Sequence, residues 1–245
     1  MNQIVNLLPT LLLSFTLTGA VTLTTTPLFA KTPTPITASR IYERVNPAVV
    51  MIRGNNGRGS GFIIRDDGLI VTNAHVVKGE AEVVTVMMAD GKTEIPADVV
   101  GFANNGVDLA LLKINRSAKF PTVSFGNTGS IKVGNPVYAI GTPLQELNLN
   151  TFTSGIVSAI RTGDLIQHNA AINSGNSGGP LLNDKGQLIG VNVSLSVTRV
   201  IDGNGRIIGI ATGNAGLGYA LSVDLVRKLL VDFAQGKISP VSTIK

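Results

Sequence analysis

From Ile41 onward, short runs of β-branched and other apolar residues alternate with clusters of Gly, Asn and Asp. Runs of this length, bounded by turn residues, are typical of β-strands. The strands predicted from this pattern are 61–64, 69–72, 83–88, 97–102, 109–114, 137–140, 152–160, 188–195, 197–201 and 207–211. Strands and helices do not alternate along the chain, which argues against a parallel sheet.

Two Asp-Gly pairs mark tight turns between predicted strands. Asp67-Gly68 separates 61–64 from 69–72, and the turn 202–205 begins with a second Asp-Gly pair. In the two-residue hairpin turn that Asp-Gly favours, type I′, both central residues take positive φ, which we expect at Asp67 and Gly68.

One segment has a helical period instead. The apolar residues on its predicted face are Leu225, Val226, Leu229, Leu230 and Phe233. We expect a helix over 222–235, with Ser222 capping its start and Gly236 following its end. The stretch 126–135 is rich in Gly, Asn and Ser, and it is expected to divide two β-subdomains, about 39–125 and 136–221. The fold class is therefore predicted as all-β with a C-terminal helix.

The N-terminal 30 residues have a different composition. They carry no charged side chain and include a leucine-rich stretch, and they end in Leu28-Phe29-Ala30 before Lys31. This pattern predicts an export signal over 1–30 with cleavage after Ala30. The alternative is an uncleaved membrane anchor, with the rest of the chain outside the cytoplasm. Residues 31–38 are expected to form a flexible lead-in.

Composition narrows the chemistry. Hydrophobic residues make up 44% of the 245 residues, enough for a substantial core. The chain has no cysteine, which excludes disulfides, a thiol nucleophile and cysteine-based zinc sites. The net charge is +5, but Lys and Arg are scattered singly, so we expect a solvated surface and no nucleic-acid partner.

The segment 173–180 reads Asn-Ser-Gly-Asn-Ser-Gly-Gly-Pro, with Ser177 among glycines. A serine hydroxyl needs a base to remove its proton and backbone N–H groups to stabilise the oxyanion that develops. Glycines allow the tight turn that points those N–H groups inward. The segment therefore predicts a serine nucleophile, and the alternative is a glycine-rich turn with a solvent-facing serine.

The chain contains two histidines that could serve as the base. His75 lies where a predicted strand ends among small residues, whereas His168 is expected in a polar loop with no apolar frame to fix it. Asp108 opens an apolar strand and is the candidate acid that orients the imidazole. Taken singly, His75 could be a structural histidine, and Asp108 a simple turn residue.

The order of these residues along the chain separates the known serine hydrolase folds. An α/β-hydrolase needs a histidine after the serine, and no histidine follows His168. A subtilisin order needs an acid well before the histidine on an α/β framework, which this chain does not offer. The order His75, Asp108, Ser177 is that of chymotrypsin, and the strand-rich pattern agrees with it.

The chain also resembles the protease domain of the HtrA (Deg) family, from about Tyr42 to Ala220. Five blocks in the correct order carry the resemblance: Gly-Ser-Gly-Phe-Ile at 59–63, Thr-Asn-Ala-His-Val-Val at 72–77, Asp-Leu-Ala-Leu-Leu at 108–112, Thr-Ser-Gly-Ile-Val-Ser at 153–158 and Gly-Asn-Ser-Gly-Gly-Pro at 175–180.

The resemblance implies two six-stranded antiparallel β-barrels within a protease domain over 39–236, with the active site between them. It implies an oxyanion hole at the backbone N–H groups of Gly175 and Ser177, with Asn176 between them. It also implies an endopeptidase that degrades unfolded or damaged proteins, and a homotrimer that packs through the segment near Tyr42. No metal or cofactor is expected, because every reacting group belongs to the protein.

Several features depart from the family pattern. No PDZ domain is expected after the protease domain, and the segment 196–216 looks longer than usual. Asn169 stands where the family usually has aspartate, and Ser174 where it often has proline or arginine.

Two residues of this architecture bear on activation and specificity. Asn176 cannot supply the carboxylate that pairs with a new N-terminus in zymogen-type relatives, so we expect no activation by cleavage. The base of the specificity pocket lies six residues before the serine, at Ala171, which predicts a preference for small or aliphatic P1 residues. The expected pocket walls are Val193, Leu195 and Tyr219. A catalytically silent chaperone or binding module on the same scaffold is the alternative function.

Overall fold

The computed structural model describes residues 36–55, 57–80, 82–143, 149–161, 164–193, 198–201, 207–211, 216–242 and 244. The predicted signal over 1–30 and the second hairpin turn at 202–205 lie outside the described residues. No helix in the described part of the chain is both long and apolar enough to cross a membrane.

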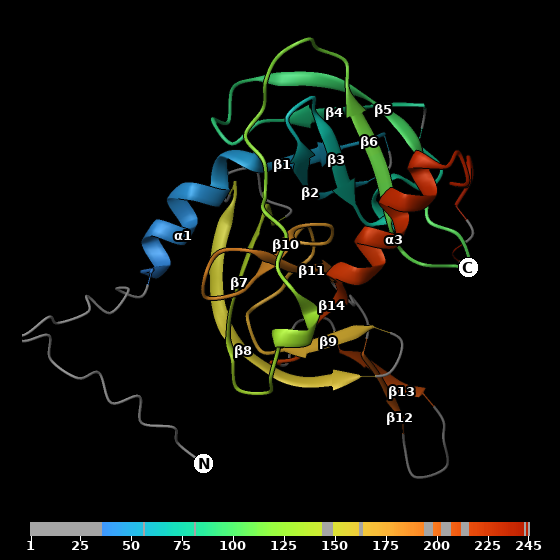
Figure 1. Cartoon of the computed structure of the whole chain (residues 1–245). Coiled ribbons are helices and arrows are strands. Elements are labelled where there is room, and N and C mark those ends of the chain that lie inside the picture. Colours follow the sequence, from blue (N-terminus) through green and yellow to red (C-terminus); the bar gives the residue numbers. More distant parts are fainter. Residues whose placement is uncertain are drawn as a thin grey trace, which may run out of the picture. The chain divides into compact units, whose positions relative to one another are not determined.

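Six strands form a first closed barrel, in which every neighbouring pair is antiparallel and the order is β1-β2-β3-β6-β5-β4 (Figure 1). The strands are β1 (Val49–Arg53), β2 (Arg58–Arg65), β3 (Leu69–Thr72), β4 (Val83–Met87), β5 (Glu94–Phe102) and β6 (Ala110–Ile114). The short helix α2 (Ala74–Val77) follows β3 directly. The barrel therefore presents the His75 segment at the end of one of its strands.

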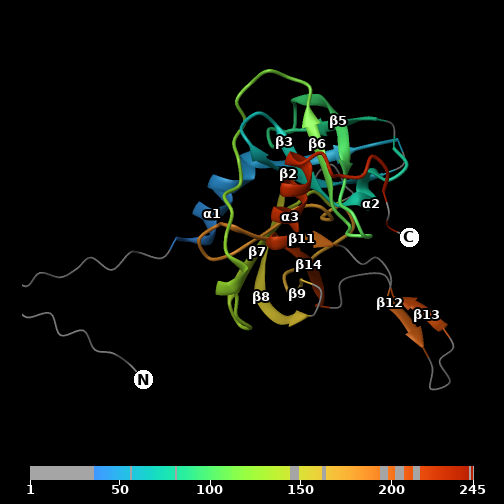
Figure 2. The ribbon, with the colours of Figure 1, turned by 45° about the vertical axis from the view of Figure 1, so that its right-hand side comes forward.

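The second barrel has the order β10-β11-β14-β9-β8-β7, again with antiparallel neighbours. Its strands are β7 (Pro136–Gly141), β8 (Thr151–Arg161), β9 (Leu165–His168), β10 (Pro180–Leu182), β11 (Leu188–Val193) and β14 (Gly218–Ser222). The prediction of two six-stranded antiparallel barrels is confirmed. Within 196–216, β12 (Thr198–Ile201) and β13 (Ile207–Ala211) pair as a separate two-stranded sheet (Figure 2).

Four barrel strands were not expected from the sequence: β1, β9, β10 and β14. All residues of β10 and four of the five in β1 are buried, so these strands show no alternation of apolar and polar positions. By contrast β5 alternates clearly, with Ile95 and Ala97 buried between exposed neighbours. Strands that are buried on both faces lack the period-two signal on which sequence-based prediction relies.

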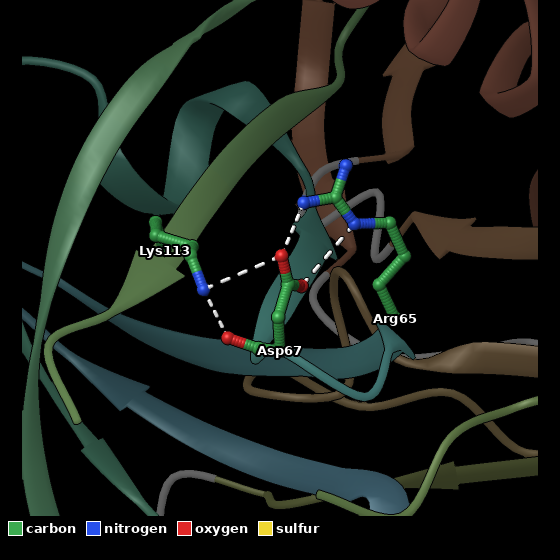
Figure 3. Close-up of polar contacts among 3 residues, drawn as sticks. All are labelled: Arg65, Asp67 and Lys113. Carbon is green, nitrogen blue, oxygen red and sulfur yellow. Dashed lines mark hydrogen bonds and ion pairs between the residues drawn. The ribbon is translucent and has the colours of Figure 1, made fainter. Parts of the chain in front are cut away.

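The turn between β2 and β3 differs from the expected one. It spans residues 66–68, and only Gly68 has positive φ, at 88°. The register shifts between Ile63 and Arg65, as in three-residue hairpins that close with a bulge. The Asp67 carboxylate accepts hydrogen bonds from Arg65, and its carbonyl accepts one from Lys113 of β6 (Figure 3). These contacts tie the turn to the next strand of the barrel.

The helix α1 (Ala38–Val45) was also not expected, and it shows that Ala38 does not belong to a flexible lead-in. The Thr37 side chain accepts a hydrogen bond from the Arg40 N–H and caps the helix. Ile41 and Val45 are buried against the barrels.

The C-terminal helix α3 (Val223–Ala234) confirms the helical period, although Ser222 makes no side-chain capping bond. Its buried residues Val223, Val226 and Leu229 belong to one core cluster with residues of both barrels, such as Leu111 and Val191. The two barrels therefore share a continuous core, which fixes one against the other.

Candidate active site

His75 and Asp108 lie in two segments that connect strands of the first barrel: His75 follows β3, and Asp108 lies between β5 and β6. The Asp108 carboxylate accepts a hydrogen bond from the His75 backbone N–H at 2.9 Å. Its second oxygen lies 2.7 Å from Nδ1 of the same residue's ring. One carboxylate thus fixes both the backbone and the ring of His75, which leaves Nε2 as the nitrogen that can exchange a proton with a substrate or nucleophile.

The position of Asp108 is itself fixed by the start of α2. Asn73, at the N-cap position of α2, donates its side-chain amide to the Asp108 carbonyl at 2.8 Å. Leu109, the next residue, is completely buried in the core. The side chain of His75 is 40% exposed and that of Asp108 is 22% exposed, so the pair lies at the surface of the barrel and is open to a ligand.

Ser177 lies in a buried turn between β9 and β10, and the residue as a whole is only 4% exposed. Gly178 has a φ of 85°, and a methyl group there would lie 2.1 Å from the Ser60 carbonyl oxygen. A side chain at this position would therefore be strained and would also collide with the first barrel. The glycine after the serine is required by both backbone conformation and packing.

The serine turn lies directly beside the histidine segment. A methyl group at Gly178 would also lie 2.4 Å from Thr72 Oγ1 and 3.1 Å from the Asn73 backbone nitrogen. A methyl group at Gly59 would meet both the Val76 side chain and the Ser177 carbonyl oxygen. Residues on either side of His75 therefore pack against the turn that carries Ser177.

Ser60 joins the two barrels at this site, a role that sequence reasoning missed. Its N–H donates to the Ser177 carbonyl at 2.8 Å, and its hydroxyl donates to the Gly175 carbonyl at 2.7 Å. The same hydroxyl accepts the Thr142 N–H at 2.8 Å. Ser60 stood within the Gly-Ser-Gly-Phe-Ile block, but nothing in the block indicates partners 82 and 115 residues away.

The residues predicted for the oxyanion hole form the tight part of the turn. Gly175 has a φ of 99°, and the Asn176 N–H donates to the Asn173 carbonyl at 2.9 Å. Within the described part of the chain, no partner accepts a hydrogen bond from the Gly175 N–H. Asn176 is buried, and its side-chain oxygen has no described hydrogen-bond partner.

The predicted pocket residues lie in the second barrel. Val193 and Tyr219 are direct cross-strand partners in β11 and β14, so their side chains lie on one face. Ala171 is exposed, and its carbonyl accepts a hydrogen bond from Thr153. Leu195 lies outside the described residues.

The expectation for His168 is wrong. It is the last residue of β9 and is completely buried, rather than part of a polar loop. Leu165–His168 contains two apolar and two polar residues, a pattern that does not indicate a buried strand. Among the described residues, no group of three or more His, Asp or Glu side chains is placed to hold a metal ion.

Comparisons with known proteins agree with this geometry. Residues 59–191 match the family model described as "Trypsin-like peptidase domain". "Serine protease PepD" of Mycobacterium tuberculosis is 34% identical over 235 residues, covering 85% of this chain and 49% of that protein. A "Probable periplasmic serine endoprotease DegP-like" of Chlamydia pneumoniae is 45% identical over 163 residues, covering 62% of this chain and 31% of that protein.

Among solved structures, "HtrA-type protease AlgW with tripeptide" aligns with a TM-score of 0.68 at 30% identity, covering 83% of this chain and 65% of that one. The chain spans half or less of the length of the two curated relatives. The family model covers more than half of the 245 residues. The DegP-like relative is a serine endoprotease by name, and the solved structure is an HtrA-type protease by name. The chain belongs to the family of trypsin-like peptidase domains and, within it, to the HtrA type.

Proposed function

We propose that the protein is a serine endopeptidase whose catalytic residues are His75, Asp108 and Ser177. The observation that carries this proposal is the double contact of the Asp108 carboxylate with His75, at 2.9 Å to the backbone and 2.7 Å to the ring. This contact orients the histidine next to a buried serine in a glycine-rich turn. The family and the names of the relatives support the same activity.

In the first half of the reaction, Ser177 Oγ attacks the carbonyl carbon of the scissile peptide while His75 Nε2 takes the hydroxyl proton. Asp108 stabilises the imidazolium that forms. The tetrahedral intermediate carries its negative charge on the former carbonyl oxygen. We assign its stabilisation to the backbone N–H groups of Gly175 and Ser177, on either side of Asn176.

The intermediate collapses when the C–N bond breaks and His75 gives its proton to the departing amine. The product is an ester between the peptide acyl group and Ser177 Oγ. In the second half, His75 takes a proton from water, which attacks the ester carbonyl. Ser177 then leaves with that proton, which releases the peptide acid and regenerates the enzyme, with water as the only co-reactant.

A fluorophosphonate probe tests this chemistry directly. We expect covalent labelling of the wild type at Ser177 and none of Ser177→Ala, with both proteins folded by circular dichroism. His75→Ala should lower the labelling rate by several orders of magnitude. A folded wild type that stays unlabelled over the whole pH range would contradict the proposal and favour a silent binding module.

The substrate preference proposed for the pocket is a small or aliphatic P1 residue. Ala171 brings no negative charge to the expected pocket base, and Val193 and Tyr219 face the same side of the second barrel. Ala171→Asp should move P1 preference toward Lys and Arg, by at least about tenfold in relative kcat/KM, because a carboxylate at the pocket base would pair with a cationic P1 side chain. Mass spectrometry of fragments from an unfolded model protein measures both enzymes in one assay. A wild-type profile dominated by Arg or Lys would contradict the assignment.

The proposed substrates are unfolded or damaged proteins outside the cytoplasm, since relatives carry names that include "periplasmic".

The proposed assembly is a homotrimer that packs through the segment near Tyr42. In the single chain, Phe152 lies between two tyrosines: it makes an edge contact with Tyr42 at 5.5 Å and a stacked contact with Tyr138 at 5.4 Å. Sedimentation velocity should give three times the chain mass, and a monomer at all concentrations would contradict this assembly.

A further inference from the structure

His168 is the second histidine of the chain, and the proposed triad does not use it. It ends β9 and has no exposed surface. Burying an imidazole without strong partners is costly, so its buried position needs a physical reason.

The register of three neighbouring strands places His168 near Asn192. His168 pairs with Gly218 of β14, and Ala220 of the same strand pairs with Asn192 of β11. Cross-strand partners, and residues two apart in a strand, share a face of the sheet. His168, Gly218 and Asn192 therefore lie on the same buried face of the second barrel.

Gly218 leaves the space that the imidazole fills. A methyl group there would lie 2.5 Å from Cε1, 2.9 Å from Nδ1 and 3.0 Å from Nε2 of the His168 ring. The ring consequently lies across β14 where this strand has no side chain, and extends toward β11. Any larger residue than glycine would push the ring away.

Asn192 holds the backbone that follows Ser177. Its N–H donates to the Gly179 carbonyl at 2.9 Å, and its carbonyl accepts the Gly178 N–H at 2.9 Å. Its side-chain amide donates to the carbonyls of Gly179, at 3.2 Å, and Pro180, at 2.9 Å. These four hydrogen bonds fix the three residues after the serine.

The side-chain amide of Asn192 is used by the turn, but its side-chain oxygen is buried without a described partner at ordinary hydrogen-bond geometry. The same is true of both ring nitrogens of His168. The imidazole and this oxygen lie on the same buried face, with only Gly218 of β14 between them, so the ring is the side chain placed to donate to this oxygen.

Burial lowers the pKa of His168 to about 4, although the Asn192 side chain and the Tyr219 backbone both act in the opposite direction. Groups that favour the protonated ring are hydrogen-bond acceptors toward it. Among the described residues of β8, β9, β11 and β14, no charged side chain contributes to this shift. The ring is therefore neutral at physiological pH and carries a single N–H, which can donate to one acceptor at a time.

We propose that His168 is a positioning residue for the nucleophile turn: its neutral ring holds the side chain of Asn192, which in turn holds the backbone of Gly178 to Pro180. This role rests on the proposed serine peptidase function. A side chain of similar size without a donor would fill the space but leave the Asn192 oxygen without a partner, and the amide that clamps the turn would lose its orientation.

Two variants of similar volume separate positioning from packing. His168→Leu fills the space without a donor, whereas His168→Gln keeps an N–H donor that can reach Asn192. With a peptide substrate, we expect His168→Leu to lower kcat by about tenfold with KM changed less than about twofold, because the buried Asn192 oxygen then has no donor placed toward it. His168→Gln should retain kcat within about threefold. The rate of fluorophosphonate labelling at Ser177 should follow kcat.

The variant Asn192→Leu tests whether His168 acts through Asn192. If His168 acts through Asn192, adding His168→Leu to Asn192→Leu should lower kcat no further. Equal kcat for His168→Leu and His168→Gln, or additive losses in the double variant, would overturn the proposal.

A measurement on the wild type keeps the proposal testable if a variant does not fold. The chain has only two histidines, so imidazole 15N spectra resolve each ring, and His75→Gln assigns them. We expect the His168 ring to stay neutral from pH 8 to pH 5 with one fixed tautomer. Titration near pH 6.5, or a mixture of tautomers, would overturn it. A wild type that fluorophosphonate never labels would instead refute the peptidase function itself.

Discussion

His75 is oriented from two sides by a single carboxylate. Asp108 accepts both its backbone N–H and, at 2.7 Å, its ring Nδ1. The backbone contact fixes where α2 begins, and the ring contact fixes which nitrogen carries the proton. Both contacts depend on the two oxygens of one side chain. Even a conservative substitution of Asp108 is therefore expected to lower kcat strongly.

Asp108→Asn should lower kcat by about 10⁴-fold with little change in KM, because an amide presents its N–H to the ring and favours the wrong tautomer. The thermal unfolding midpoint should change by only a few degrees. Steady-state kinetics with a peptide substrate checks the first statement and calorimetry the second. A loss of less than tenfold would mean that Asp108 does not orient the base.

His168 gives a second prediction at the residue scale, for the dependence of stability on pH. Its pKa is about 4 in the folded protein because of burial, against about 6.5 for an unperturbed histidine. Between these values the unfolded chain binds a proton that the folded chain does not. The free energy of unfolding should therefore decrease as the pH falls from 6.5 to 4, with a total contribution of about 3 kcal/mol.

Urea unfolding of the wild type and His168→Gln at several pH values isolates this contribution, since every other titrating group is common to both. We expect the stability difference between them to change by up to about 1.4 kcal/mol per pH unit in this range and to be constant above pH 7. A constant difference at all pH values would show that His168 is not held neutral by the fold.

At the scale of elements, a glycine in β14 leaves space for a side chain of β9. Gly218 is the position where the strand has no side chain, and the His168 ring occupies that space. The pairing of Gly218 with His168 is set by the register of the two strands. A shift of the register by one residue would place the imidazole on the outer face of the barrel.

Gly218→Ala should destabilise the protein by about 1–3 kcal/mol, because the new methyl group collides with a buried ring. In the background of His168→Ala the same change should be better tolerated, since the methyl group then enters the vacated space. The double variant should be more stable than the sum of the single changes by about 1 kcal/mol or more. Denaturant unfolding of the four proteins measures this coupling, and strict additivity would contradict the contact.

At the scale of the whole molecule, the proposed active site combines residues of the two barrels. The first barrel contributes His75 and Asp108, and the second contributes the turn with Ser177. Ser60 connects them through hydrogen bonds to both sides of that turn and to Thr142. The packing of α3 in a core common to both barrels fixes the same relative position from another direction.

Ser60→Ala should therefore affect both stability and activity. It leaves the Gly175 carbonyl and the Thr142 N–H, both in buried residues, without their hydroxyl partner, which costs about 1–3 kcal/mol. Because Gly175 is a proposed oxyanion donor, kcat should fall by about tenfold or more. Ser130→Ala is a matched control, since its exposed hydroxyl makes one local bond to Asn127. Equal behaviour of the two variants would contradict the bridging role.

Part of this architecture was predictable because it follows from the pattern of apolar and polar residues within single segments. The clear alternation in β5 and the helical period of α3 each reflect one buried face. The strands β1 and β10, buried at nearly every position, and the turn at 66–68 were missed or misjudged. Their conformation depends on partners in neighbouring strands, which no window of sequence contains.

The sequence by itself determined the candidate chemistry: two histidines, no cysteine and the order of His75, Asp108 and Ser177 left one proposed catalytic arrangement, and the five sequence blocks indicated the family. Only the tertiary structure decided how that arrangement is supported. Ser60 reaches the Gly175 carbonyl across 115 residues, and His168 lies buried at the end of β9 rather than in a loop. The physical reason is that catalytic residue types and their order are properties of the chain, whereas burial and the partners of a polar group arise only when distant strands pair.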